Sequence, residues 1–473
     1  MSTVAIKAPP LSIARNDFPT WLPAMLVKEL RQGLRARAFV GALVLYQVAM
    51  ALVVVAGVAD ASSTFNFLQG AYWGVLGVVL LVVTPLRAIT GLQAEIESRT
   101  VDLLLLTRLN AWRIVAGKWL SLVTQAVLLV VASLPYGVAR YFFGSVEVTT
   151  DVSILGGMLG GCALLTAMAL WASGLPKVVR ILVGIGAFVL AQSTSTTLFY
   201  LFNPAYGMRP ALFRGMNTYL FCFNCVLWFG LCMIGAVRRL APPATNLSPA
   251  LRLLPLLGFL PLPFLSRAAV TGQLISVAIL GVIVAVLELA RTATPMPCHW
   301  RQFQRRGAWA RAVARLMMPG WASAFEWLMV LVAGALLGAI FTTDPGHIIR
   351  IVLTGAGALA LPALAISFLR SDFPQRTAGY GLILGVGSLI SAVAAGISSG
   401  TPLSQFTDGL LLVLPISGFW WSVNLTSIPS DGVAALQAAV ACAVLGATWW
   451  RGQSYRRQLR EFAAESATAP VKS

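Results

Sequence analysis

The sequence predicts an all-α polytopic membrane protein with about twelve transmembrane helices, and three observations lead to this fold class. Of the 473 residues, 58% are hydrophobic and only 11% are charged, whereas soluble domains carry about 25% charged residues. Apolar runs of about 20 residues, the length that crosses a bilayer, recur along the whole chain. The gaps between these runs are too short to hold a water-soluble domain of ordinary size.

Each full-length apolar run predicts one spanning helix, and a shorter proline-rich run from Leu251 to Leu265 is expected to span as well. The run at 407–425 differs, because it contains Pro415, Gly418 and two tryptophans. Counting it as a span would place the basic C-terminal tail outside, against the positive-inside rule, so we predict an outer re-entrant segment there. The full-length runs are 38–59, 66–86, 116–137, 152–174, 180–202, 216–237, 269–290, 321–342, 348–369, 378–397 and 431–450.

The distribution of basic residues predicts that the N- and C-termini are both cytoplasmic. All but five of the 34 Lys and Arg residues fall in segments that this topology places inside. The net charge of +18 is then a topology signal with some attraction to anionic membrane lipids, and nucleic-acid binding is not expected. We predict a protein of the plasma (inner) membrane of a prokaryote. The five outer residues are Arg140, Arg209, Arg214, Arg267 and Arg350.

The apolar runs and the charged stretches between them predict six consecutive regions. The basic stretch at 301–320 carries arginines at helical spacing and is expected to form a helix lying on the inner membrane surface. The predicted regions are a cytoplasmic N-terminus with an amphipathic helix (1–37), a six-span domain (38–240), an additional span pair (241–300), the interfacial helix (301–320), a four-span bundle (321–450) and a cytoplasmic tail (451–473).

Two cytoplasmic segments are candidates for contact with another protein. Between Leu22 and Phe39 the spacing predicts an amphipathic helix, with basic residues on one face and leucines on the other. The loop at 90–118 concentrates charge in a chain that has little of it. Its acidic start, its apolar centre at 103–106 and its basic end suit a short helix whose dipole these charges complement. In the amphipathic helix predicted between Leu22 and Phe39, the basic face holds Lys28, Arg31 and Arg35, and the apolar face holds Leu26, Leu30 and Leu34.

The stretch from Glu97 to Leu109, followed by Trp112-Arg-Ile-Val-Ala-Gly-Lys118, resembles the signature of the ABC-2-type permeases. In that family an acidic start, an aliphatic run and a distal Gly-Lys mark the cytoplasmic coupling helix after the second span. The segment from Lys28 to Arg37 similarly resembles the elbow helix that precedes the first span. The two matches occur in the family's order and cover about the first 140 residues. This sequence departs from the pattern at Arg99, where the family usually has Gly, and at Arg108, where it usually has Pro.

The resemblance implies the membrane subunit of an ABC exporter, driven by ATP hydrolysis on a separate ATPase subunit. The chain is not expected to be an enzyme, because Gly117-Lys118 lacks the earlier glycine of a phosphate-binding loop and is followed by Trp119. ATP and Mg would bind to the partner, and no cofactor or metal is expected here. The implied coupling residues are Glu95, Glu97, Arg99, Thr100, Asp102, Arg108, Arg113 and Lys118. The implied elbow residues are Lys28, Glu29, Arg31, Arg35 and Arg37.

Two other classes of function stay open at this stage. An ion-driven secondary transporter would place carboxylates within the membrane, whereas Glu288 and Glu326 lie near the ends of predicted spans. An integral membrane lipid-linked transferase would need clustered acids or histidines, whereas His299 and His347 fall on opposite sides of the predicted membrane. For the exporter reading we expect a homodimer with one coupling loop per chain, the alternative being a degenerate pseudo-dimer within one chain. The transported substrate does not follow from the sequence.

Overall fold

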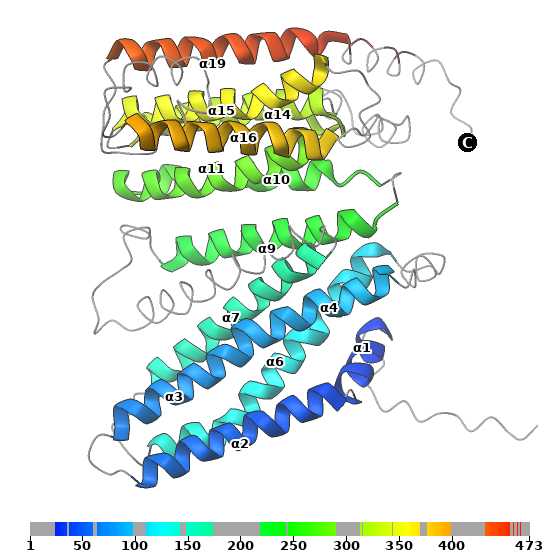
Figure 1. Ribbon diagram of the computed structural model, residues 1–473, viewed down its shortest axis with the longest axis vertical. Helices are drawn as coiled ribbons and strands as arrows, with labels where there is room; N and C mark the ends of the chain where they lie inside the picture. The colour runs from blue at the N-terminus through cyan, green and yellow to red at the C-terminus, as the bar shows by residue number, and fades with distance from the viewer. Residues whose placement is uncertain are drawn as a thin grey trace, which may run out of the picture. The chain divides into compact units, whose positions relative to one another are not determined.

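The computed structural model is helical throughout the part of the chain that it describes, without any strand. The helices fall into two compact units, residues 1–207 and 208–473 (Figure 1). The described residues are 24–35, 37–59, 64–97, 110–141, 148–173, 218–242, 245–289, 313–314, 316–342, 344–368, 376–398 and 431–454, with the single positions 457, 461 and 464.

Unit 1 is a bundle of long apolar helices with one short amphipathic helix at its start. The core is built from apolar side chains of five elements, α2, α3, η1, α6 and α7, among them the fully buried Met50, Leu76, Leu80 and Ala126. The bounds are α1 Ala24–Arg35, α2 Arg37–Ala59, α3 Thr64–Val78, η1 Val79–Val83, α4 Thr84–Glu97, α6 Ala111–Tyr141 and α7 Val148–Ser173.

The π-turn η1 joins α3 to α4 in one continuous rod (Figure 1), and Pro85 gives its physical cause. A proline inside a helix lacks an N–H and its ring clashes with the carbonyl four residues earlier. A single wider turn before the proline relieves this conflict. The Thr84 N–H and hydroxyl both donate to the carbonyl of Val79, the hydroxyl at 3.0 Å, so that carbonyl is satisfied.

A second group of polar side chains joins α2, α3 and α6 around Pro135, which lies inside α6, and the Tyr72 hydroxyl of α3 is hydrogen-bonded to that of Ser133 at 3.3 Å. The Gln47 amide donates to the carbonyl of Ala132 at 3.3 Å, and the Tyr136 hydroxyl donates to the carbonyl of Gln47 at 3.3 Å. These side chains therefore link these helices by hydrogen bonds within an otherwise apolar bundle.

Unit 2 packs around a larger apolar core that contains the fully buried Trp327, Phe325, Leu231 and Tyr380. The Tyr380 hydroxyl donates to the carbonyl of Leu359 at 2.8 Å, so this buried aromatic carries no unmet polar group. The bounds are α9 Thr218–Leu240, α10 Ser248–Leu257, η4 Leu262–Phe264, α11 Arg267–Leu289, α14 Trp321–Ala339, α15 Pro345–Phe368, α16 Arg376–Ser398 and α19 Asp431–Arg451.

The proline-rich run predicted at 251–265 is an interrupted helix. α10 has only 10 residues, about 15 Å, which alone is half of the hydrocarbon thickness. Ser248 and Arg252 contact Glu288 at the end of α11, whereas Ser266 directly precedes the start of α11. The segment 248–266 therefore returns along the whole length of α11, through a turn and the 3₁₀ helix η4.

Seven described helices are long and apolar enough to cross a membrane, or eight if the bent pair of α1 and α2 counts as one span. The all-helical, membrane-embedded architecture agrees with the sequence, while the number of about twelve spans stays a prediction. The predicted span 180–202 and the re-entrant segment 407–425 lie outside the described residues, as does most of the predicted interfacial helix at 301–320. α9, assigned from sequence to the six-span domain, belongs to unit 2, where it packs against α10 and α11.

Candidate functional site

The loop predicted at 90–118 consists of helix ends at both sides of residues 98–109. Glu95 and Glu97 belong to the last turns of α4, and α6 begins at Ala111. The rod formed by α3, η1 and α4 has 15, 5 and 14 residues, and α6 has 31. At about 1.5 Å per residue both exceed the ~30 Å hydrocarbon core. The two helices of this hairpin can therefore project beyond the membrane at their connected ends.

The start of α6 is set by Asn110. Its side-chain oxygen accepts from the Trp112 N–H at 3.3 Å, and its carbonyl accepts from the Arg113 N–H at 2.9 Å. An asparagine in this position satisfies N–H groups that the first helical turn leaves without partners. Ile114 is fully buried while Trp112 and Arg113 are exposed, so the first turn packs on one side only.

The amphipathic helix α1 lies against α6 with Leu26 and Leu30 buried and Leu34 half-buried. Leu26 and Leu30 are 3% and 8% exposed, whereas the basic residues of the opposite face are exposed. Gly33 allows the close approach, because a Cβ there would lie 2.3 Å from the side-chain nitrogen of Gln125 in α6. The chain bends by 61° between α1 and α2. α1 is therefore held by packing on α6 as well as by its covalent link to α2.

An ion pair joins the two segments that the sequence singled out. The Nζ of Lys118 in α6 lies 3.9 Å from an Oε of Glu29 in α1, and both side chains are largely buried. A lysine side chain is ordinarily exposed to solvent because of its charge. Burial of its charge requires a nearby carboxylate, which Glu29 supplies. The structure thus brings together one predicted coupling residue and one predicted elbow residue.

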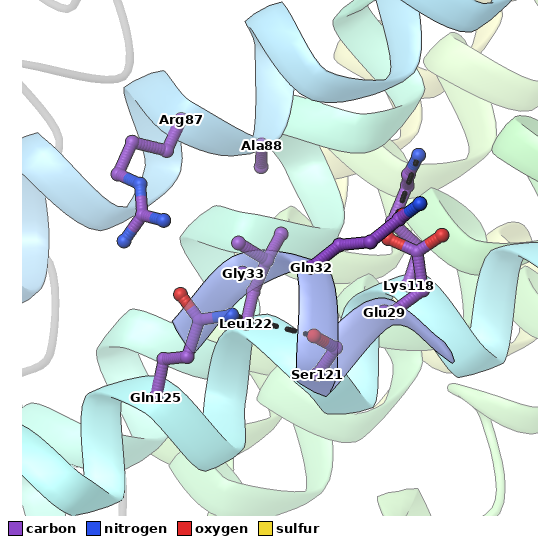
Figure 2. Close-up of a pocket in the computed structure, with 9 residues that line it drawn as sticks. All are labelled: Glu29, Gln32, Gly33, Arg87, Ala88, Lys118, Ser121, Leu122 and Gln125. Atoms are coloured by element: carbon purple, nitrogen blue, oxygen red, sulfur yellow. Dashed lines mark hydrogen bonds and ion pairs between the residues drawn. The ribbon is translucent and has the colours of Figure 1, made fainter. Parts of the chain in front are cut away.

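A polar cavity of about 280 Å³ lies beside this ion pair, between α1, α4 and α6 (Figure 2). In the view of Figure 2, Arg87 and Gln125 lie on one side of the cavity, and Glu29 and Lys118 lie on the other. The lining residues are Glu29, Gln32, Gly33, Arg87, Ala88, Lys118, Ser121, Leu122 and Gln125.

Two lining residues give the cavity its chemistry. The Arg87 guanidinium stacks over the ring of Phe39 at 5.2 Å, and it has no ion-pair partner among the described residues. Gln125 is 3% exposed and donates its amide N–H to the Ser121 hydroxyl at 3.4 Å. The Gln125 oxygen has no hydrogen-bond partner within the described ranges. The cavity therefore offers a cation and a buried acceptor on the same side.

The other predicted site residues have varied positions. Arg113 is exposed at the start of α6, and the structure describes the backbone but not the side chains of Glu95 and Glu97. The sequence did not single out Arg87 or Gln125, although an arginine near the end of an apolar run is a usable signal. Lys28, Arg31, Arg35 and Arg37 are exposed, and Arg99, Thr100, Asp102 and Arg108 lie outside the described residues.

Unit 2 contains a second concentration of charge, buried where α9, α10 and α11 meet. Glu288, fully buried, accepts two bonds from Arg252, at 2.6 and 3.0 Å, and pairs with Arg238 at 2.5 Å. The Ser248 hydroxyl donates to its other oxygen at 3.3 Å. Arg252 also donates to the carbonyls of Leu316 and Gly320, at 2.5 and 3.4 Å. Both Glu288 oxygens are therefore occupied.

Gly320 positions the chain for these contacts. Its φ of 131° and ψ of 156° lie in a region that only glycine adopts without strain. This conformation turns the chain into α14, and the Ser323 hydroxyl donates back to the Gly320 carbonyl at 3.0 Å. The charged cluster thus ties the start of α14 to α10 and α11.

No protein-family model, curated protein or solved structure matches this chain. In the portion of the chain that the structure describes, no three His, Cys, Asp or Glu residues are grouped as metal ligands would be. The fold and the described site define a membrane-embedded helical protein with a polar cavity between α1, α4 and α6.

Proposed function

We propose that this chain is the transmembrane permease subunit of an ATP-driven ABC exporter of the ABC-2 type. A separate ATPase subunit would bind the cytoplasmic hairpin at 90–118, and its movement would be transmitted to the membrane helices to move a substrate across. The proposal draws on the sequence resemblance at 97–118 and 28–37. The hairpin formed by α4 and α6 is compatible with it, because both helices run from that loop into the bundle.

The observation that carries the proposal is the buried pair of Lys118 and Glu29. A force on the loop at 98–109 would act directly on the helix ends that flank it. α6 is continuous from Ala111 through Lys118, so displacement of its first turns would move the Lys118 side chain. Because Lys118 contacts α1, and α1 leads into α2, the same displacement would reach the first span. Elbow helix and coupling loop would then respond together.

Two sets of variants test this function, in co-purification and ATPase assays with a candidate ABC ATPase subunit. The first set reverses the charges at Glu95→Lys and Glu97→Lys, with Glu461→Lys in the tail as a matched control. We expect the double reversal to weaken complex formation and to abolish stimulation of ATP hydrolysis, while the control retains both. Wild-type complex formation and stimulation in the double variant would refute the coupling role.

The second set exchanges the ion pair. Lys118→Glu alone places two carboxylates together and should uncouple ATP hydrolysis from the permease without preventing ATPase binding. Adding Glu29→Lys restores opposite charges, and we expect it to recover at least half of the lost stimulation. If the exchanged pair is no better than the single variant, α1 does not take part in transmission.

Light scattering on the same complexes measures whether two copies of this chain assemble.

A further inference from the structure

We propose that the cavity between α1, α4 and α6 binds the headgroup of a membrane phospholipid, with the phosphate on Arg87 and a headgroup donor on Gln125. The ligand class is a phosphate ester whose alcohol carries N–H or O–H donors, as in ethanolamine or glycerol headgroups. This site does not depend on the permease function proposed above.

The first step of the inference is charge. Glu29 and Lys118 form an ion pair, so the formal excess charge of the cavity lining comes from Arg87. A guanidinium presents several N–H donors in a plane and binds phosphate oxygens in pairs. Stacking on Phe39 fixes one face of Arg87 and leaves the N–H edges available. An anion such as phosphate is the natural partner.

The second step is the acceptor. Gln125 is almost fully buried, and its side-chain oxygen accepts no hydrogen bond among the described residues. A buried acceptor of this kind lowers stability unless a donor reaches it. Arg87 and Gln125 lie on the same side of the cavity in Figure 2. A ligand that satisfies both therefore carries an anion and a hydrogen-bond donor. Choline headgroups have the phosphate but lack the donor, so they satisfy only Arg87.

The third step is size and depth. About 280 Å³ is just below the range of roughly 300–1,000 Å³ for sites that enclose drug-sized ligands, so a headgroup fits and a larger molecule does not. Arg87 lies three residues before the end of the candidate span Gly70–Thr90, and Phe39 begins the apolar part of α2. These are the depths at which headgroups lie, and basic pockets between helices at this level bind them.

The fourth step concerns the source of the phosphate. An exposed apolar stripe runs along α2 away from Phe39, at a spacing of four residues, and Leu86 beside Arg87 is also exposed. Such a stripe can hold acyl chains while the headgroup occupies the cavity, which favours a lipid over a free phosphate ester. The stripe consists of Val40, Val44, Val48 and Leu52.

Native mass spectrometry of the detergent-purified chain tests the site, with phosphatidylethanolamine, phosphatidylglycerol and phosphatidylcholine of identical acyl chains. We expect the first two lipids to bind several-fold more tightly than phosphatidylcholine. Arg87→Gln should weaken their binding about tenfold, the ratio expected for one charge-assisted contact. Arg451→Gln is the matched control, because Arg451 also stacks on a phenylalanine, Phe368, at 5.1 Å, and should leave binding unchanged.

Gln125→Leu keeps the charge and removes the acceptor, so it should reduce the preference over phosphatidylcholine to less than twofold. If gel filtration shows that Arg87→Gln does not fold, Gln125→Leu alone still tests whether the cavity binds the headgroup. Soluble phosphoethanolamine, added in place of lipid, decides the source: binding as tight as that of the lipid would assign the site to a free phosphate ester. Equal binding of all three lipids, or unchanged binding in both cavity variants, would overturn the proposal.

Discussion

The polar cavity of unit 1 and the charged cluster of unit 2 solve the problem of buried polarity in opposite ways. Around Glu288 both carboxylate oxygens have protein partners, supplied by Arg252, Arg238 and Ser248. Around Gln125 the protein supplies a partner for the amide nitrogen only, and Arg87 has a ring but no carboxylate among the described residues. One arrangement is closed and the other has capacity for a ligand.

This difference indicates which region is structural and which is adjustable. A cluster that is complete within the protein gains nothing from a ligand, and any movement breaks several charge-assisted bonds at once. A cavity with unused donors and acceptors can change its occupant or its shape at smaller cost. We therefore expect rigidity where α9, α10, α11 and α14 meet, and adaptability where α1 rests on α6.

Removal of the carboxylate in unit 2 should have the largest effect on stability. Glu288→Gln leaves two arginines buried without a negative charge, and loss of one partner from a buried ion pair costs about 3–5 kcal/mol. Unfolding of the purified protein in mixed micelles, followed by circular dichroism, measures this loss. Glu461→Gln, in the exposed tail, serves as the control. A change below about 1 kcal/mol would show that the cluster does not hold unit 2 together.

Much of the helical framework followed from the sequence, because apolar runs of spanning length have few other structures available to them. The run at 269–290 corresponds to α11, Arg267–Leu289, and the run at 431–450 corresponds to α19, Asp431–Arg451. The start of α6 was less predictable. The span was predicted to begin at 116, at the end of the charged loop, yet α6 already begins at Ala111, where Asn110 caps it, and Glu29 neutralises Lys118 within the helix.

The site itself could be predicted only in part, because its contacts join residues far apart in the chain. Glu29 and Lys118 were both singled out, but for separate segments, and nothing local shows that they meet. Arg252 is a single charge in a proline-rich run, and its partner Glu288 lies 36 residues away. Pairing of this kind depends on how helices pack, which the periodicity of one helix does not determine.

A neutral network in unit 2 offers a smaller test of the same contrast. Asn224 donates to the Gln273 oxygen at 2.8 Å and accepts from the Ser276 hydroxyl at 2.8 Å, while Gln273 donates to the carbonyl of Gly258 at 2.7 Å. Asn224→Leu leaves the Gln273 oxygen and the Ser276 hydroxyl without these partners. We expect a loss of about 1–2 kcal/mol in the same unfolding assay. No loss would mean that the network tolerates gaps as the cavity does.

Gln125→Leu in unit 1 should have the smallest effect on stability, although Gln125 is even more buried than Asn224. The substitution removes a buried oxygen that has no partner among the described residues, which stabilises the fold. It also removes one weak hydrogen bond to Ser121, which destabilises the fold by a similar amount. In lipid-free detergent we expect a change within about 0.5 kcal/mol. With added phosphatidylethanolamine the wild type should gain stability by mass action, and the variant should gain less. A loss in lipid-free detergent as large as that of Asn224→Leu would show that both regions are equally closed.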